Sequence, residues 1–147
     1  MSGRRFFSRA PALAIALFAT AACMNLHDPM NHGDVFREQQ RQFSQYIRWG
    51  NFQGAAGFVV PEQRAEFVAL APELTDVRFT EYEILSLEIE DGMSKATADV
   101  LYTGYRLSSP ISRSMLVRQT WEPAGFDTWH VRLELDPLRK ALGLAAK

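Results

Sequence analysis

The spacing of apolar residues changes near residue 76, and this change constrains the fold more than any other feature of the chain. Residues 34–51 and 61–71 carry apolar side chains at intervals of three, four and seven, which place them on one face of an α-helix. From residue 77 onward, four segments carry apolar side chains at alternate positions, the pattern of half-buried strands. Helices followed by sequential strands predict an α+β domain with a four-stranded antiparallel sheet.

Turn-forming residues are expected to mark the ends of these segments. Asp34 is expected to cap the first helix, and Gly50 to end it in a left-handed conformation. Pro61 is expected at the first position of the next full helix. Asp91–Gly92 and Ser109–Pro110 are expected to form turns between strands.

The first strand is expected to be bent. Its apolar residues alternate at Val77 and Phe79, shift phase to Tyr82 and Ile84, and shift again at Leu85. Such phase shifts are typical of β-bulges, which add a residue to one strand and bend it.

The first 22 residues have the order of an export signal. Arg4, Arg5 and Arg9 precede an apolar run at residues 10–19, and small residues follow it. The run is too short for a membrane-spanning helix, which needs about 20 apolar residues.

The single cysteine, Cys23, directly follows these small residues. The sequence "TAAC" resembles the lipobox of bacterial lipoproteins, in which the cysteine becomes the first mature residue and is acylated, although Thr20 stands where leucine is usual. The resemblance implies a signal peptide at residues 1–22 and a lipid anchor on Cys23. Because Met24 rather than aspartate follows, we expect the anchor in the outer membrane, facing the periplasm. The alternative is cleavage by an ordinary signal peptidase near Ala21.

The rest of the chain is expected to be a single domain at residues 34–136. Residues 23–33 are polar and aperiodic, so they are expected to be a tether, and residues 137–147 a C-terminal tail. His27 and His32 lie in the tether, where nothing else would converge on a metal ion, so no metal site is expected.

The charge of the expected mature chain argues against nucleic acid as a partner. From Cys23 onward there are 13 basic and 17 acidic residues, a net charge of about −4. An acidic body repels phosphate backbones.

The chain resembles the nuclear-transport-factor-2-like superfamily, which includes polyketide-cyclase-like and ketosteroid-isomerase-like proteins. The resemblance lies in a long first helix ending in "YIRWGNFQGAAGFVVPEQRAEF" and in bent strands ending in "TWEPAGFDTWHV". It implies N-terminal helices packed in the concave face of a curved sheet, a cone-like fold with an apolar pocket. Asn51 departs from the aspartate that many relatives have.

Five residues are expected to line this pocket if it is open. They are Tyr46, Tyr102, Arg113, Met115 and Trp121. The alternative is that the aromatic side chains fill the core and Arg113 lies at the rim in water. Asp99 and His130 alternate with apolar residues on their strands, so they are expected to point away from the cone.

No catalytic constellation and no cofactor motif is recognisable in the sequence. We therefore expect a membrane-tethered, non-enzymatic interaction module of the cell envelope, which contacts another envelope protein or a second copy through its sheet. Leu101, Tyr105 and Leu107 give the outer sheet face an apolar character that favours such contacts. The alternative is a small apolar or amphipathic ligand in the cone; an isomerase- or hydratase-like enzyme is a third and weaker hypothesis.

Overall fold

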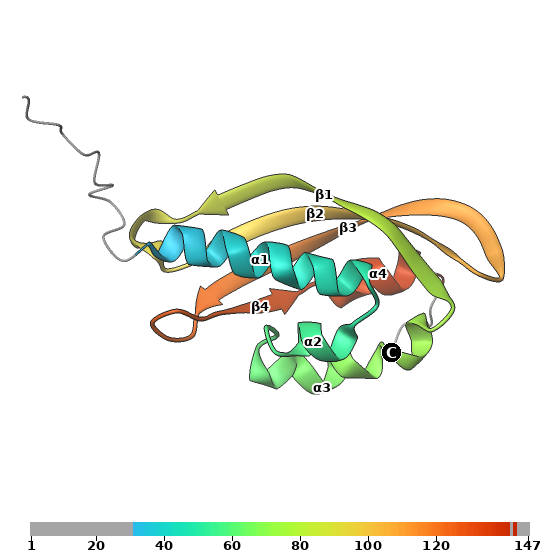
Figure 1. Ribbon diagram of the computed structural model, residues 1–147, viewed down its shortest axis with the longest axis horizontal. Coiled ribbons are helices and arrows are strands. Elements are labelled where there is room, and N and C mark those ends of the chain that lie inside the picture. Colours follow the sequence, from blue (N-terminus) through green and yellow to red (C-terminus); the bar gives the residue numbers. More distant parts are fainter. Residues whose placement is uncertain (1–30, 142, 144–147) are drawn as a thin grey trace, which may run out of the picture.

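The computed structural model in Figure 1 describes residues 31–141 and 143. In chain order its elements are α1 His32–Arg48, α2 Phe52–Ala56, α3 Pro61–Ala69, the 3-10 turn η1 Pro72–Leu74, β1 Val77–Ile89, the 3-10 turn η2 Asp91–Met93, β2 Ala96–Arg106, β3 Ser109–Pro123, β4 Trp129–Leu133 and α4 Leu135–Ala141.

The four strands form one open antiparallel sheet in the order β1-β2-β3-β4, and α1 crosses one face of it (Figure 1). Side chains on this inner face alternate along the strands and are buried. They are Ala96, Ala98, Val100, Tyr102, Met115, Val117, Gln119, Trp121, Trp129, Val131 and Leu133. The predicted α+β class, with helices packed on a four-stranded antiparallel sheet, is confirmed.

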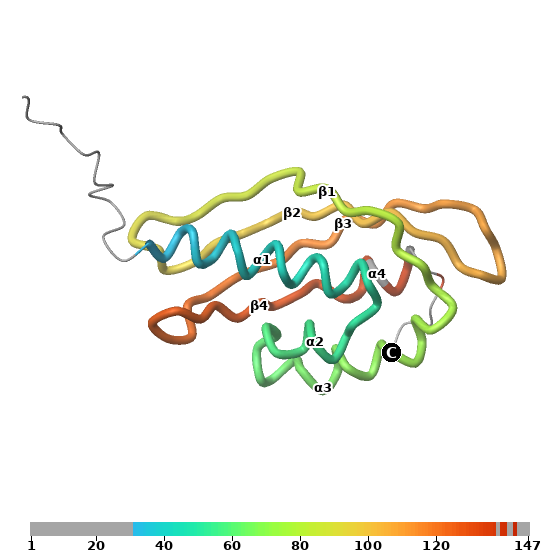
Figure 2. The backbone as a smooth tube through the Cα atoms, in the orientation of Figure 1, coloured from blue at the N-terminus to red at the C-terminus, as the bar shows by residue number. Residues whose placement is uncertain are grey.

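β1 is bent, as the phase of its apolar residues predicts. Its pairing with β2 shifts register between Phe79 and Glu81 and again between Ile84 and Ser86, and its trace in Figure 2 is accordingly not straight. At the first shift Gly104 faces Phe79, and a Cβ atom on Gly104 would lie 2.7 Å from the carbonyl oxygen of Arg78. The missing side chain of Gly104 therefore permits the close approach of the two strands at the bend.

The free edge of β4 is covered by side chains and a connecting segment. The amide group of Gln39 accepts from the N–H of Trp129 at 2.8 Å and donates to the carbonyl of Asp127 at 2.7 Å. Gln63 makes the same pair of bonds with the backbone of Leu133, at 2.9 and 2.8 Å. Between them, the segment 58–60 bonds to the N–H and carbonyl of Val131. These contacts satisfy an edge that would otherwise be open to another strand.

Gly50 ends α1 with a φ of 69°, as predicted. The N–H of Gly50 bonds to the carbonyl of Ile47, and that of Asn51 bonds to the carbonyl of Tyr46, so the last carbonyls of the helix have partners. Pro61 likewise starts α3, as predicted.

Three boundaries differ from the expected ones. α1 begins at His32, so His32 and Gly33 belong to the helix rather than to the tether, and Asp34 lies in the first turn bonded to Arg37 instead of capping. Residues 137–141, expected in the tail, belong to α4, whose Leu135 joins the core. The turn between β2 and β3 lies at residues 107–108, because Ser109 already pairs with Arg106 and Pro110 already belongs to β3.

The expected signal peptide, Cys23 and most of the expected tether lie outside the described residues. Within residues 31–141 and 143, no helix has the length and apolar character needed to cross a membrane.

Candidate functional site

The structure brings together four of the five residues predicted to line a pocket, and it places the fifth apart. Tyr102, Met115 and Trp121 have at most 2% of their surface exposed, and half-buried Tyr46 packs against Phe58 at the edge of the same core. Arg113 lies further along β3, where the side chain is exposed. The arrangement corresponds to the alternative in which aromatic side chains fill the cone.

Trp121 is the centre of this filling. Its ring meets those of Phe36, Phe43 and Phe58 edge-on, with centroids 5.7, 5.7 and 6.5 Å apart. Phe36 and Phe43 come from α1, so the helix and the sheet interlock through aromatic contacts. Such edge-to-face pairs add stability beyond the burial of their area.

A chain of buried polar groups crosses the same interface. The Tyr102 hydroxyl donates to Ser44 Oγ at 3.2 Å and accepts from Gln119 Nε2 at 3.1 Å. Gln119 Oε1 accepts from the indole N–H of Trp121 at 3.1 Å and from Gln40 Nε2 at 3.3 Å. Gln40 Nε2 also bonds to Ser44, while Gln40 Oε1 is buried without a hydrogen-bond partner.

These side chains are neutral, and burial raises the pKa of Tyr102 above its usual value. General acid–base catalysis needs a group whose pKa lies near the working pH and which can reach a substrate. Tyr102 meets neither condition, because its hydroxyl is buried and bonded to Ser44 and Gln119. The cluster is suited to fixing α1 on the sheet.

The α1 members of this cluster are recognisable from their spacing in the sequence. Gln40 and Ser44 are four residues apart and share the helix face of Phe36, Phe43 and Ile47. A polar pair at helical spacing on an apolar face predicts buried hydrogen bonds. The partners on β2 and β3 cannot be identified from that spacing alone.

Asp99 and His130 lie on the outer face of the sheet, as predicted from strand alternation. Asp99 accepts two hydrogen bonds from Arg118, at 2.8 and 3.0 Å, and one from Ser86 at 3.2 Å. The bonds from Arg118 are the main cause that lowers the pKa of Asp99. This carboxylate is therefore charged and paired outside the cone.

The outer face carries a small apolar centre within an acidic surround. Leu101 and Leu116 are cross-strand partners at its middle, and Leu116 is 47% exposed. Three exposed glutamates, Glu81, Glu83 and Glu88, lie opposite outer-face residues of β2. We refer to this surface as the outer face, defined by Leu101, Leu116, Asp99, Arg118 and these glutamates.

A hollow of about 460 Å³ is set into this face. Glu81, Glu83 and Leu101 contribute to its walls, together with Tyr82, Thr103 and Ser114. Two carboxylates beside a leucine suit the side chain of a lysine or arginine, whose methylene stem is apolar and whose end is charged.

No cluster of three or more potential metal ligands occurs among residues 31–141 and 143. His32, which was expected in the tether, lies in α1 with its ring edge-on to Phe126 at 5.9 Å. His27 is outside the described residues.

Comparison with known proteins supports the fold. The chain is similar to a SEC-C motif containing protein from Rhodopseudomonas palustris, with a TM-score of 0.54 and 17% identity over 74% of this chain and 90% of that one. It is also similar to a Bacillus subtilis protein provisionally named an isomerase, with a TM-score of 0.58 and 10% identity over 78% and 97% of the two chains. At these identities the likeness concerns the fold alone, which is an α+β arrangement of helices on an antiparallel sheet. Searches found no protein-family model and no curated protein sequence that matches the chain.

Proposed function

We propose that this chain is a membrane-tethered lipoprotein domain of the cell envelope that binds another protein through its outer face and catalyses no reaction. The observation that carries the proposal is the filled interior of the cone. Tyr102, Met115 and Trp121, the residues best placed to line a pocket, are buried at 2% exposure or less. The outer face is a better candidate for molecular contact because its apolar centre is open to solvent.

The charge of the outer face favours a basic partner over a second copy of this chain. Around Arg118 alone lie three carboxylates, those of Asp99, Glu88 and Glu134, each of which acts on the pKa of that guanidinium. Two acidic faces brought together would repel each other, whereas lysine or arginine side chains of a partner would find carboxylates beside Leu101 and Leu116.

The location in the envelope is proposed from the sequence. A lipid on Cys23 would hold the domain at the outer membrane, on the periplasmic side, through a short polar segment before α1. Labelled palmitate should enter the wild-type protein and fail to enter Cys23→Ser. A soluble wild-type protein without label would contradict this part of the proposal.

The binding proposal is tested by site-specific photo-crosslinking in the native envelope. A photoreactive amino acid at Leu116 should yield one crosslinked envelope protein. The same amino acid at Arg37, an exposed position on α1, serves as the control and should yield none. The double substitution Glu81→Lys and Glu83→Lys should abolish the Leu116 product by reversing the charge of the hollow.

Two outcomes would contradict the proposal. Equal crosslinking from Leu116 and Arg37 would mean that the outer face is not selective. A product containing only two copies of this chain would mean that the outer face binds a second copy and not a basic partner.

A further inference from the structure

A separate groove opens at the C-terminal end of α1, about 730 Å³ in volume. It lies between the ends of α1 and α3, the short helix α2, η1 and the start of β1. Its floor is apolar: Phe52, Leu74 and Val77 are buried members of the core, and Val68 and Phe79 pack against them. The volume falls within the range of small-molecule sites.

The bend of β1 positions the groove. At the register shift after Phe79, β1 changes direction, and Arg78 and Phe79 are left on the wall of the groove. On the other side, Gly50 turns the chain out of α1 and Asn51 caps α2 by accepting from the N–H of Gly54 at 2.9 Å. Both walls are therefore set by local backbone features rather than by loose loops.

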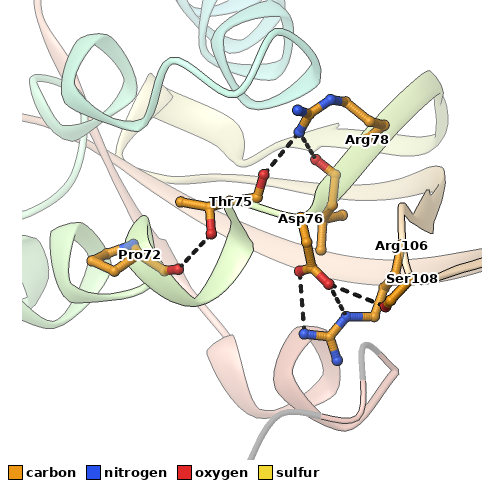
Figure 3. Close-up of polar contacts among 7 residues, drawn as sticks. Pro72, Thr75, Asp76, Arg78, Arg106 and Ser108 are labelled. Atoms are coloured by element: carbon orange, nitrogen blue, oxygen red, sulfur yellow. Dashed lines mark hydrogen bonds and ion pairs between the residues drawn. The ribbon is translucent and has the colours of Figure 1, made fainter.

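Two arginines contribute to the groove, and both are held by backbone carbonyls. Arg48 Nε donates to the carbonyl of Thr80 at 3.0 Å. Arg78 Nη1 donates to the carbonyls of Thr75 and Val77 at 3.0 and 2.9 Å (Figure 3). A guanidinium has five N–H donors, so donors of each remain for a ligand.

Neither arginine has a carboxylate oxygen within 4.0 Å among the described residues. Six other arginines there have a carboxylate oxygen within 4.0 Å. Asp76, two residues from Arg78, is bound instead by Arg106 at 3.0 and 3.2 Å and by Ser108 at 3.3 Å (Figure 3). Among residues 31–141 and 143, no acidic side chain lines the groove. Two arginines without acidic partners are thus concentrated at one apolar groove on an acidic protein.

We propose that this groove binds an amphiphile with one anionic head group and an apolar tail, such as a fatty carboxylate. Arg48 and Arg78 bind the head, because guanidinium groups form strong charge-assisted hydrogen bonds to carboxylates. The tail covers the floor formed by Phe52, Leu74 and Val77. This site is independent of the proposed protein contact, because no residue that defines the outer face lines the groove.

A membrane surface fits the groove less well than a dissolved amphiphile. The floor residues Phe52, Leu74 and Val77 are at most 6% exposed, so the single tail of a dissolved molecule reaches them where a flat membrane surface would not. The groove also lies about 25 Å from the start of α1, for a helix of 17 residues.

Trp49 provides a local probe of this site. It lines the groove, is 74% exposed, and lies 5.2 Å from the guanidinium carbon of Arg48. The other two tryptophans, Trp121 and Trp129, are buried in the core. A change in fluorescence on ligand binding is therefore expected from Trp49, and Trp49→Phe should abolish it.

The test titrates the purified full chain with laurate below its micellar concentration and follows Trp49 fluorescence and binding heat. Dodecanol and dodecyltrimethylammonium have, like laurate, a straight chain of about twelve carbons, but with a neutral and a cationic head. We expect laurate to bind at least tenfold more tightly than either, and its affinity to fall on raising the salt concentration. Arg48→Gln and Arg78→Gln should each weaken laurate binding about tenfold. Arg41→Gln, on the exposed side of α1, and Leu116→Glu, on the outer face, should leave it unchanged.

Several results would overturn this inference. One is equal affinity of the wild-type chain for the three head groups. This result needs no variant, so it remains decisive if an arginine variant does not fold. Loss of laurate binding in Arg41→Gln to the same degree would show a general charge effect. Binding to anionic lipid vesicles without binding to dissolved laurate would mean that the groove binds a membrane surface and not a dissolved amphiphile.

Discussion

At the scale of single residues, the buried hydroxyl of Tyr102 can be tested by a single substitution. Its hydroxyl joins α1 to the sheet through Ser44 and Gln119, and Gln119 in turn holds the indole of Trp121. Removing one member of a buried network leaves the others without partners in a region that water does not reach.

We expect Tyr102→Phe to lower the free energy of unfolding by about 1–2 kcal/mol, because Gln119 and Ser44 each lose a hydrogen bond. Urea unfolding followed by circular dichroism measures the change. Tyr105→Phe, a half-buried tyrosine of the same strand, is the matched control and should change stability little. An equal loss in both variants would mean that the network adds nothing specific.

The raised pKa of Tyr102 predicts an alkaline limit to stability. The neutral phenol is favoured in the folded state, so the contribution of Tyr102 is complete below about pH 10, the pKa of tyrosine in an unfolded chain, and is lost as the pH rises further. The free energy of unfolding should therefore fall above pH 10, and less steeply in Tyr102→Phe. Parallel pH profiles of the two proteins would contradict this assignment.

Gly104 is the residue on which the bend of β1 depends. A Cβ at this position would lie 2.7 Å from the carbonyl oxygen of Arg78 and 3.2 Å from the Cα of Phe79, both backbone atoms. We expect Gly104→Ala to destabilise the fold by about 1–3 kcal/mol, the usual cost of overpacking. Gly57→Ala, whose Cβ would meet its nearest atom at 3.5 Å, is the control and should be tolerated. Thermal unfolding of both variants is the measurement.

At the scale of elements, the two edge strands of the sheet are protected from further strand pairing in different ways. β4 has its outward backbone groups bonded by Gln39, Gln63 and the segment 58–60, and β1 carries bulges and exposed glutamates. Both are known means of preventing unwanted strand pairing.

Gln63→Met should show the importance of the β4 edge. Methionine keeps the length of the side chain but cannot bond the backbone of Leu133, so we expect a loss of about 1–3 kcal/mol from unpaired, partly buried groups. Gln42→Met, exposed on α1, is the control. Amide hydrogen exchange should accelerate at Leu133 in the first variant only. Unchanged exchange at Leu133 would exclude a role for Gln63 at this edge.

The elements also show where reasoning from sequence succeeds. The two bulges of β1 were predictable because a phase shift in apolar residues is a local signal. The end of α1 at Gly50 and the start of α3 at Pro61 were predictable for the same reason. The covering of β4 by Gln39 and Gln63 was not, because these bonds join residues 70 to 90 positions apart. The groove of Arg48 and Arg78 depends on the direction in which β1 bends, and a phase shift does not specify that direction.

At the scale of the whole molecule, an aromatic core fills the space between α1 and the sheet, where an open pocket was one of the two expectations. The two surfaces proposed for binding lie outside it: the outer face of the sheet, and the groove at the C-terminal end of α1. Function and stability should therefore be separable by substitution, since the residues that hold the fold together are not those proposed to contact a partner.

The most direct test of the filled cone measures partner crosslinking and folding stability in the same two variants. The photoreactive amino acid for this comparison replaces Leu101, so that Leu116 can be varied. Leu116→Glu should abolish the crosslinked product while leaving the unfolding transition near that of the wild type, because this side chain is 47% exposed on the outer face. Tyr102→Phe should lower stability while the folded fraction still forms the product. The opposite pattern, with the product lost in folded Tyr102→Phe and retained in Leu116→Glu, would place the functional site inside the cone and contradict the proposed function.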